Sequence, residues 1–232
     1  MSIKTQENSQ QQPKLWHCYN SRSLRVLWAM EELGINYTLE TMPFPPRYTV
    51  DSYKELNSLG TVPYFVDGDI QMTESVAICH YLGEKYLGEK HQDDNAVPAL
   101  ALSVTEADYG NYLNWLYHSD ATLTFPQTLV LRYREFSAPD CQQGQTADDY
   151  EKWFAARLTR LNEHLSTHDY LCADRFTMAD IAIGFSLHLA TLLKLEQHFS
   201  PPVADYLARL KQRPAFQRAQ ALGKEFDPFI RT

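Results

Sequence analysis

The spacing of apolar and polar residues predicts a strand, a helix and a second strand at the start of the chain. Short apolar runs at 14–18 and 35–39 favour strands, and the apolar segment between them, residues 24–33, favours a helix that ends at Gly34, a common C-cap. Apolar residues cover more than one face of this helix, so we expect it to be enclosed on two sides. Two strands joined through a helix are expected to be parallel.

A hairpin and a second helix are predicted next. Residues 62–66 and 70–72 have strand character, and the Asp67-Gly68 pair between them suits a tight turn. Residues 76–86 then favour a helix. Before the hairpin, the three prolines at 43, 45 and 46 predict a loop, and residues 53–57 favour a short helix.

The pattern changes after a polar, charged stretch at residues 88–98, where strand signals nearly vanish. Apolar residues then recur at helical spacing within 100–119, 146–166, 178–195 and 203–212. Thr177 and Asp180 have the spacing of a capping box, which predicts a helix start and a structural role for Asp180. We therefore predict a disordered leader at 1–13, an α/β domain at 14–87, a linker at 88–98 and an all-helical domain at 99–232.

Composition narrows the class of protein. The 232 residues are 44% hydrophobic and carry a formal charge of −8, which favours a packed globule and disfavours a nucleic-acid surface. Neither an apolar run of about 20 residues, long enough to cross a membrane, nor a secretory signal is evident. The cysteines at 18, 79, 141 and 172 lack metal-ligand spacing. We expect a soluble cytoplasmic protein without a metal site, structural disulfides or a membrane partner.

The order of these motifs resembles one known family. The strand–helix–strand unit is followed by Val62-Pro63, the hairpin, Glu74-Ser75 and a helical domain that contains Phe176-Thr177-Met178-Ala179-Asp180-Ile181. From Lys14 to about Pro214 the chain resembles the soluble, bacterial-like glutathione S-transferases. The resemblance implies a thioredoxin-like N-terminal domain, an all-α C-terminal domain, a homodimer, and glutathione as co-substrate with no further cofactor.

The resemblance also implies a set of glutathione-binding residues. Val62, before a cis Pro63, would pair its backbone with the cysteinyl part of glutathione. Glu74 and Ser75 begin a helix, whose N-terminus favours a carboxylate, so Ser75 would hold the γ-glutamyl carboxylate and Glu74 its ammonium group. Arg22 and Arg47 are loop cations and candidates to meet the glycyl carboxylate. The residues alone also allow a plain strand-entry proline, simple helix capping and a solvated arginine.

The reactive group is expected just after the first strand, where this family places a residue that hydrogen-bonds the glutathione sulfur. When Arg25-Val26 is aligned with the family, the usual position falls on Asn20 and Ser21 comes one residue later. A hydroxyl is a better donor than an amide, so Ser21 is our prediction, with Asn20 and Ser23 as alternatives. Cys18 and Ser21 also form a C-x-x-S pattern, which would make the protein a thiol transferase using Cys18.

The second substrate is expected to be a small hydrophobic electrophile or a peroxide. We expect Tyr19 to form part of the wall of its pocket. Tyr109 and Tyr112 lie in an aromatic stripe at helical spacing, which indicates core, subunit interface or pocket. The alternative to a transferase is a glutathione-binding regulator or ligand carrier without conjugating activity, and Asn20 at the usual hydroxyl position keeps that alternative open.

Overall fold

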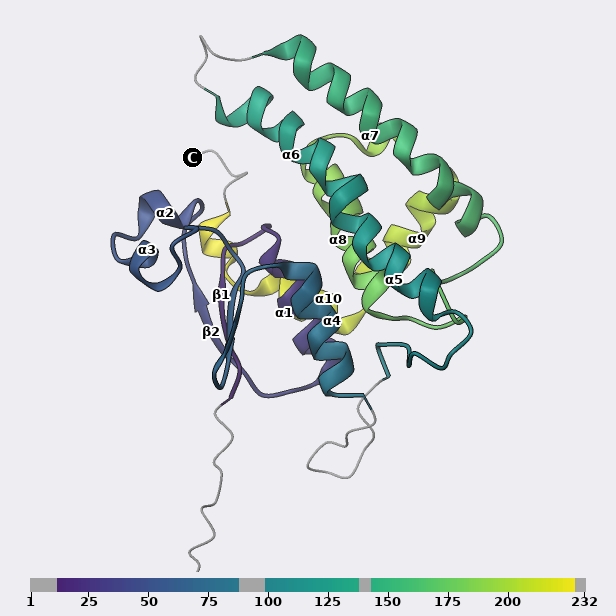
Figure 1. The fold of residues 1–232 in the computed structure, drawn as a ribbon. Coiled ribbons are helices and arrows are strands. Elements are labelled where there is room, and N and C mark those ends of the chain that lie inside the picture. The colour runs from purple at the N-terminus through teal and green to yellow at the C-terminus, as the bar shows by residue number, and fades with distance from the viewer. Residues whose placement is uncertain (1–11, 88–98, 138–142, 228–232) are drawn as a thin grey trace, which may run out of the picture.

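The fold is that of an α/β domain followed by a helical domain, as the apolar pattern predicts (Figure 1). The structure, a computed structural model, describes residues 12–87, 99–137 and 143–227. Most of the predicted leader and the whole of the predicted linker lie outside these residues. In the first domain, a sheet with the strand order β2-β1-β3-β4 packs against α1 and α4.

The elements of the first domain follow the predicted order. They are β1 (Lys14–His17), α1 (Ser23–Leu33), β2 (Thr38–Thr41), α2 (Pro46–Thr49), α3 (Tyr53–Leu56), β3 (Tyr64–Asp67), β4 (Ile70–Met72) and α4 (Ser75–Lys85). Strands β1 and β2 are parallel, and β3 and β4 form the antiparallel hairpin. Gly34 and Gly68 have positive φ angles, which end α1 and turn the hairpin respectively.

The second domain is built around one buried helix. Its elements are α5 (Tyr109–His118), η1 (Ser119–Thr124), α6 (Phe125–Leu131), η2 (Arg132–Phe136), α7 (Gly144–Leu165), α8 (Met178–Leu192), η4 (Glu196–His198), α9 (Pro201–Lys211), α10 (Pro214–Ala221) and η5 (Lys224–Phe226). Helix α8 is buried on all sides because α1, α5 and α9 pack around it. Its start at Thr177 and Asp180 is the predicted capping box, which is confirmed.

The helix predicted from residue 100 begins only at Tyr109, so its first nine residues were assigned wrongly. The apolar side chains of Leu100, Ala101 and Leu102 are buried, but in an irregular segment. The carbonyl of Leu100 accepts a hydrogen bond from the Met178 backbone at 2.7 Å. These side chains are buried because the segment packs against the start of α8. The apolar pattern of such a segment does not differ from that of a buried helix.

The two domains share one continuous core. Trp28 of α1 is buried against Phe176 and Phe216, whose ring centroids lie 5.9 and 4.9 Å away. Gly184 of α8 lets the helices approach, because a Cβ atom there would lie 3.1 Å from the Trp28 ring and 2.8 Å from Leu210. The first helix is thus enclosed on two sides, as its apolar pattern predicted.

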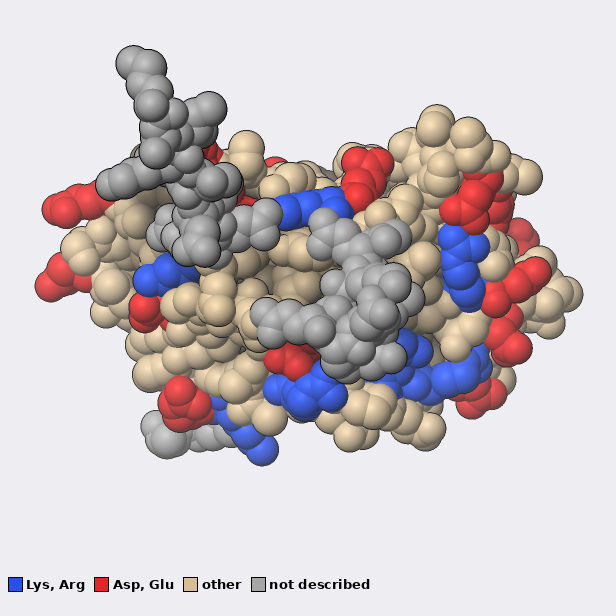
Figure 2. Space-filling view, turned by 90° about the horizontal axis from the view of Figure 1, so that it is seen from below, with Lys and Arg blue, Asp and Glu red and all other residues tan. Residues whose placement is uncertain are grey.

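The surface shows no segregation of charge on the face seen in Figure 2, where acidic and basic side chains alternate with other residues. Among the described helices, none is both long and apolar enough to span a membrane.

Replacement of Asp180 with Ala tests the start of α8. The Asp180 carboxylate accepts hydrogen bonds from the backbone of Leu171 and Thr177 and from the Tyr206 hydroxyl, at 2.8 to 3.2 Å. The variant leaves these buried donors unpaired, so we expect the free energy of unfolding to fall by about 3 kcal/mol or more. Urea denaturation measures it. Glu163→Ala, an exposed acid on α7, is the control, and an equal small effect of both substitutions would contradict this role.

Candidate functional site

The hairpin and the loop before it form one edge of the candidate site. The Val62-Pro63 bond is cis, as the resemblance implied. The preceding carbonyl, that of Thr61, accepts hydrogen bonds from the Tyr53 hydroxyl at 2.7 Å and from Asn57 Nδ2 at 2.8 Å. Within the described residues the Val62 backbone makes no hydrogen bond, so its N–H and C=O are available to an extended ligand.

The N-terminus of α4 places two side chains beside this edge. Glu74 is the N-cap residue, and its exposed carboxylate meets no partner in the described parts of the chain. The Ser75 oxygen accepts a hydrogen bond from Arg25 Nη1 at 3.0 Å. Because Arg25 can only donate, Ser75 keeps its own proton for another acceptor. The helix start therefore offers a hydroxyl donor, free backbone N–H groups and a separate carboxylate.

Arg25 is a fully buried cation whose five N–H donors are all used. Besides Ser75 it binds a set of groups on the second domain: Asp120 Oδ1 at 2.9 Å, Thr124 Oγ1 at 2.8 Å, Ser186 Oγ at 3.0 Å and the Ala182 carbonyl at 3.3 Å. Its guanidinium also lies 4.6 Å from the Phe185 ring centroid. Burial lowers the pKa of Arg25, and the nearby Asp120 opposes that shift.

Asp120 connects the binding edge to the loop after β1. Its Oδ1 accepts from Arg25 and, at 3.3 Å, from Arg22 Nε. Burial raises the pKa of Asp120, but the two guanidinium groups outweigh that effect and hold it below its usual value. Arg22 also donates to Thr128 Oγ1 at 2.8 Å. The Asp120 carboxylate therefore binds both Arg25, which holds Ser75, and Arg22, which follows Ser21 in the chain.

Ser21 is the partly exposed hydroxyl of this loop, whereas Asn20 and Ser23 are buried. Ser21 Oγ donates to the Cys18 carbonyl at 2.7 Å, just before the N-terminus of α1. Of the candidates for contact with a ligand sulfur in this loop, Ser21 alone combines a hydroxyl with access to solvent.

Asn20 is hydrogen-bonded through its side-chain amide to other parts of the protein. Its φ of +55° is unusual for a residue other than glycine. The side-chain oxygen accepts from His188 Nε2 at 3.2 Å and Gln220 Nε2 at 2.9 Å, and Nδ2 donates to Asp227 at 3.4 Å. Asn20 thus holds α8, α10 and the segment after α10 against the loop, an arrangement that does not support a role on the sulfur.

Cys18 has the environment of a core cysteine. Its side chain is buried in a cluster with Met42, Tyr53 and Val62, and Sγ lies 3.5 Å from the Pro43 carbonyl. Burial raises the pKa of the Cys18 thiol to about 12, so the thiolate is scarce at neutral pH. This placement does not support a thiol transferase that uses Cys18.

The predicted aromatic wall lies largely away from this loop. Tyr112 is fully buried in the core between α4 and α5, where its ring lies 6.0 Å from that of His80. Tyr109 begins α5 at the opposite end from Asp120, and its ring lies 6.3 Å from Tyr112. Neither position supports a pocket role. Tyr19 is buried beside Asn20, within the loop itself.

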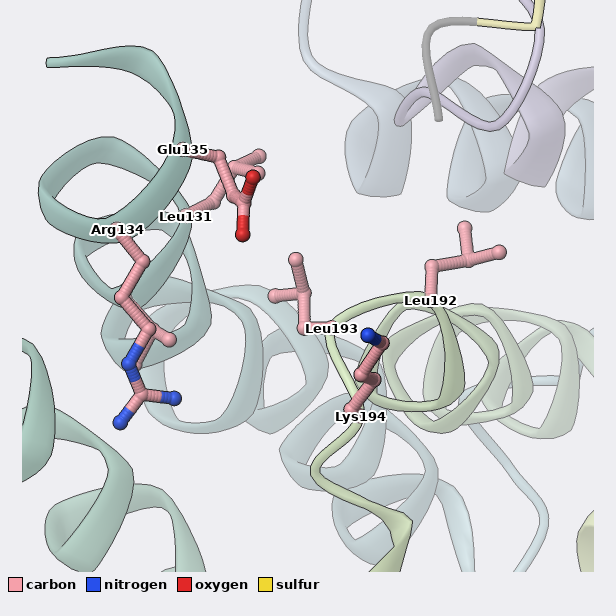
Figure 3. A pocket seen from close by; sticks show the side chains of 7 residues that line it. Leu131, Arg134, Glu135, Leu192, Leu193 and Lys194 are labelled. Atoms are coloured by element: carbon pink, nitrogen blue, oxygen red, sulfur yellow. The ribbon is translucent and has the colours of Figure 1, made fainter. Parts of the chain in front are cut away.

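Two contacts with the helical domain flank Ser21: Arg22 with Thr128 and Asn20 with His188. A pocket of about 420 Å³ opens one helical turn beyond them. Leu131 follows Thr128 by about one turn on α6, and Leu192 follows His188 by one turn on α8. Figure 3 shows Leu131 and the Glu135 carboxylate on one side of the pocket, directed toward Leu193, with Lys194 beside Leu193 and Arg134 turned away. No periodic pattern in the sequence indicates this pocket, because its walls come from helices distant in sequence.

Arg47 lies over the loop that leads to Val62. It is exposed on α2, and its guanidinium lies 4.7 Å from the Tyr48 ring centroid. Gly60, with a φ of +61°, allows this approach, because a Cβ atom there would lie 2.7 Å from Arg47 Cβ. In the described ranges, no cluster of three or more His, Cys, Asp or Glu side chains is arranged to hold a metal ion.

Sequence reasoning missed Arg25, Asp120 and His188 as parts of the site. Arg25 had a detectable signal, since it is a charged residue in the middle of an apolar helix that was expected to be enclosed on two sides. Asp120 and His188 had none, because their importance depends on which distant residues they meet.

A thioredoxin-like domain with a cis-proline edge, followed by an all-helical domain, defines the glutathione transferase fold class. Two family profiles match the chain: "Glutathione S-transferase, N-terminal domain" over residues 15–90 and "Glutathione S-transferase, C-terminal domain" over residues 121–214. The chain belongs to the glutathione S-transferase family, and the predicted enzyme class is confirmed.

Relatives match over most of their length. Glutathione S-transferase F9 of Arabidopsis thaliana is 30% identical, with 85% of this chain and 91% of the relative covered. GstA of Escherichia coli O157:H7 is 26% identical, with 89% and 96% covered. Among solved structures, a theta class glutathione S-transferase from Xanthomonas axonopodis pv. citri with glutathione bound is 25% identical, has a TM-score of 0.74, and matches over 89% and 96% of the two chains.

Replacement of His188 with Gln tests its burial beside Asn20. Burial, and then the charge of Lys211, lowers the pKa of His188 to about 3. Between pH 6.5 and 4 the unfolded chain therefore binds a proton at this histidine that the folded chain does not. As the pH is lowered through this range, the free energy of unfolding decreases by about 1.4 kcal/mol per pH unit. Gln keeps a donor near Nε2 but does not titrate, so urea denaturation across this range should show a slope shallower by about that amount. Parallel slopes for the two proteins would refute the assignment.

Proposed function

We propose that this enzyme binds glutathione between the Val62 edge and the α4 N-terminus and activates its thiol beside Ser21. The observation that carries the proposal is the shared carboxylate of Asp120. It binds Arg25, which holds Ser75, and Arg22, which adjoins Ser21. The ligand-binding end of α4 and the loop hydroxyl therefore belong to one fixed cluster.

Glutathione has three polar parts, and each has a matching group. Ser75 and the first N–H groups of α4 receive the γ-glutamyl carboxylate, and Glu74 pairs with the adjacent ammonium group. The Val62 N–H and C=O pair with the cysteinyl backbone. Arg47, exposed above the same loop, receives the glycyl carboxylate. The cation of Arg25 behind Ser75 adds long-range attraction for the γ-glutamyl carboxylate.

The sulfur then lies at Ser21. The thiol proton leaves to solvent, and the Ser21 hydroxyl turns from the Cys18 carbonyl to donate to the thiolate. The N-terminus of α1, which begins at Ser23, also favours negative charge there. Stabilised in this way, the thiolate is present at neutral pH without a metal or further cofactor.

The electrophile lies in the pocket between α6 and α8. Leu131 and Leu192 offer apolar walls about one turn from the groups that flank Ser21. The thiolate attacks an electrophilic carbon, the S–C bond forms, and the leaving group departs with the bonding electron pair. With a peroxide, attack on oxygen breaks the O–O bond and a second glutathione reduces the resulting sulfenic acid. This chemistry fits detoxification in the cytoplasm.

We also propose a homodimer. Phe125, Tyr150 and Trp153 form an exposed aromatic cluster on α6 and α7, in which the Tyr150 and Trp153 rings stack at 5.5 Å. Phe125 is 47% exposed and Trp153 39%. Large aromatic groups clustered on a surface favour association with a partner.

Replacement of Ser21 with Ala tests the proposed function. The variant removes a hydrogen bond to the thiolate, so we expect kcat/KM with a test electrophile to fall by about 10- to 100-fold, while calorimetric glutathione affinity stays unchanged. Ser166→Ala, an exposed serine at the end of α7, is the control. Full activity in Ser21→Ala would remove Ser21 from the role. Glutathione binding without turnover of several electrophile classes by the wild type would favour a regulator or ligand carrier.

Replacement of Trp153 with Glu tests the dimer. At micromolar concentration we expect the wild type to sediment as a dimer and the variant as a monomer, because a carboxylate would be buried in the contact. Lys152→Ala, at the neighbouring exposed position, should remain a dimer. A wild-type monomer, or an unchanged dimer in Trp153→Glu, would refute this interface.

A further inference from the structure

Behind Ser21 lies a short line of hydrogen bonds that ends on a buried histidine. Ser21 Oγ lies 2.7 Å from Ser23 Oγ, and Ser23 Oγ lies 2.8 Å from His17 Nδ1. His17 is the last residue of β1, Ser23 is the first of α1, and both are fully buried. Three titratable or hydroxyl side chains within seven residues are thus joined, and only Ser21 reaches solvent.

Proton counting gives the direction of each bond. The Cys18 carbonyl can only accept, and Ser21 Oγ, at 2.7 Å, is closer to it than Ser23 Oγ, at 3.4 Å, so Ser21 donates its one proton there. The bond between the two serines must therefore be donated by Ser23. Ser23 then has no proton left for His17, so His17 donates through Nδ1–H. All the donors point from the buried imidazole toward Ser21.

The surroundings of His17 keep its ring uncharged. Burial lowers the pKa of His17 to about 4, against a smaller raising effect of the Leu222 backbone, so the ring is neutral at physiological pH. A neutral ring with Nδ1–H has an unprotonated Nε2. Within the described residues no atom meets hydrogen-bond geometry with Nε2, so the Leu222 backbone, which raises the pKa, makes only a weak contact with the ring. Gly223 packs against the ring, since a Cβ there would lie 3.4 Å from His17 Cδ2.

We propose that His17 and Ser23 are positioning residues that direct the Ser21 hydroxyl proton to the glutathione sulfur. This inference rests on the proposed role of Ser21. Because Ser21 already accepts a bond from Ser23, its own proton is the one group left to donate, and it turns from the Cys18 carbonyl to the thiolate. Each donated bond polarises the next, which makes Ser21 a stronger donor than an isolated serine.

The test is the thiol pKa of enzyme-bound glutathione, followed by the ultraviolet absorbance of the thiolate across pH. Ser21→Ala removes the last donor and should raise that pKa by about one to two units. His17→Leu and Ser23→Ala remove donors behind Ser21 and should raise it by about half a unit, with glutathione affinity unchanged. His17→Asn places an amide near the Nδ1 position and should restore the wild-type value.

A matched control separates this effect from general loss of stability. His118 is a half-buried histidine on α5, and desolvation followed by the charges of Arg160 and Arg157 lowers its pKa to about 4. His118→Leu should leave the bound thiol pKa unchanged. Ser23→Ala, a small substitution, gives an answer even where a His17 variant folds poorly.

Two results overturn the inference in different ways. If Ser21→Ala raises the thiol pKa but Ser23→Ala and His17→Leu do not, Ser21 acts alone and the positioning role is wrong. If Ser21→Ala leaves the thiol pKa unchanged, the proposed role of Ser21 fails, and the positioning role with it. An equal shift of the bound thiol pKa in His17→Leu and His118→Leu also overturns the positioning role, because the effect then comes from a general change in structure.

Discussion

The buried guanidinium of Arg25 is the interaction on which the site depends. A charge removed from water is costly unless its donors are all paired, and each of the five N–H groups of Arg25 has an acceptor. The acceptors come from α4 in the first domain and from η1 and α8 in the second. The arginine is therefore satisfied only when the domains are docked, which couples the folding of the two domains to the geometry of Ser75.

The contacts of Arg25 and Asp120 position two separate parts of the site. One arm runs from Arg25 to Ser75 and fixes where a carboxylate can bind. The other runs from Asp120 to Arg22 and fixes the loop that carries Ser21. Asn20 closes that loop from the other side through His188 and Gln220. Ser21 is thus held between two sets of contacts with the helical domain, next to a pocket whose walls belong to that domain.

The sequence predicted what depends on local pattern and missed what depends on distant neighbours. Gly34, Asp67-Gly68 and the capping box at Thr177 gave correct boundaries, because turns and caps are encoded within a few residues. The stripe that contains Tyr112 was ambiguous, since burial in a core and exposure to a pocket have the same spacing. The contact of Asn20 with Gln220 was not predictable in this way, because the two residues lie 200 positions apart.

A crystal structure with glutathione bound tests the central claim most directly. We expect the γ-glutamyl carboxylate at Ser75, with the Arg25 bond retained, and the sulfur about 3 Å from Ser21 Oγ. A sulfur placed against Asn20 or Cys18, or a carboxylate bound without contact to Ser75, would contradict it.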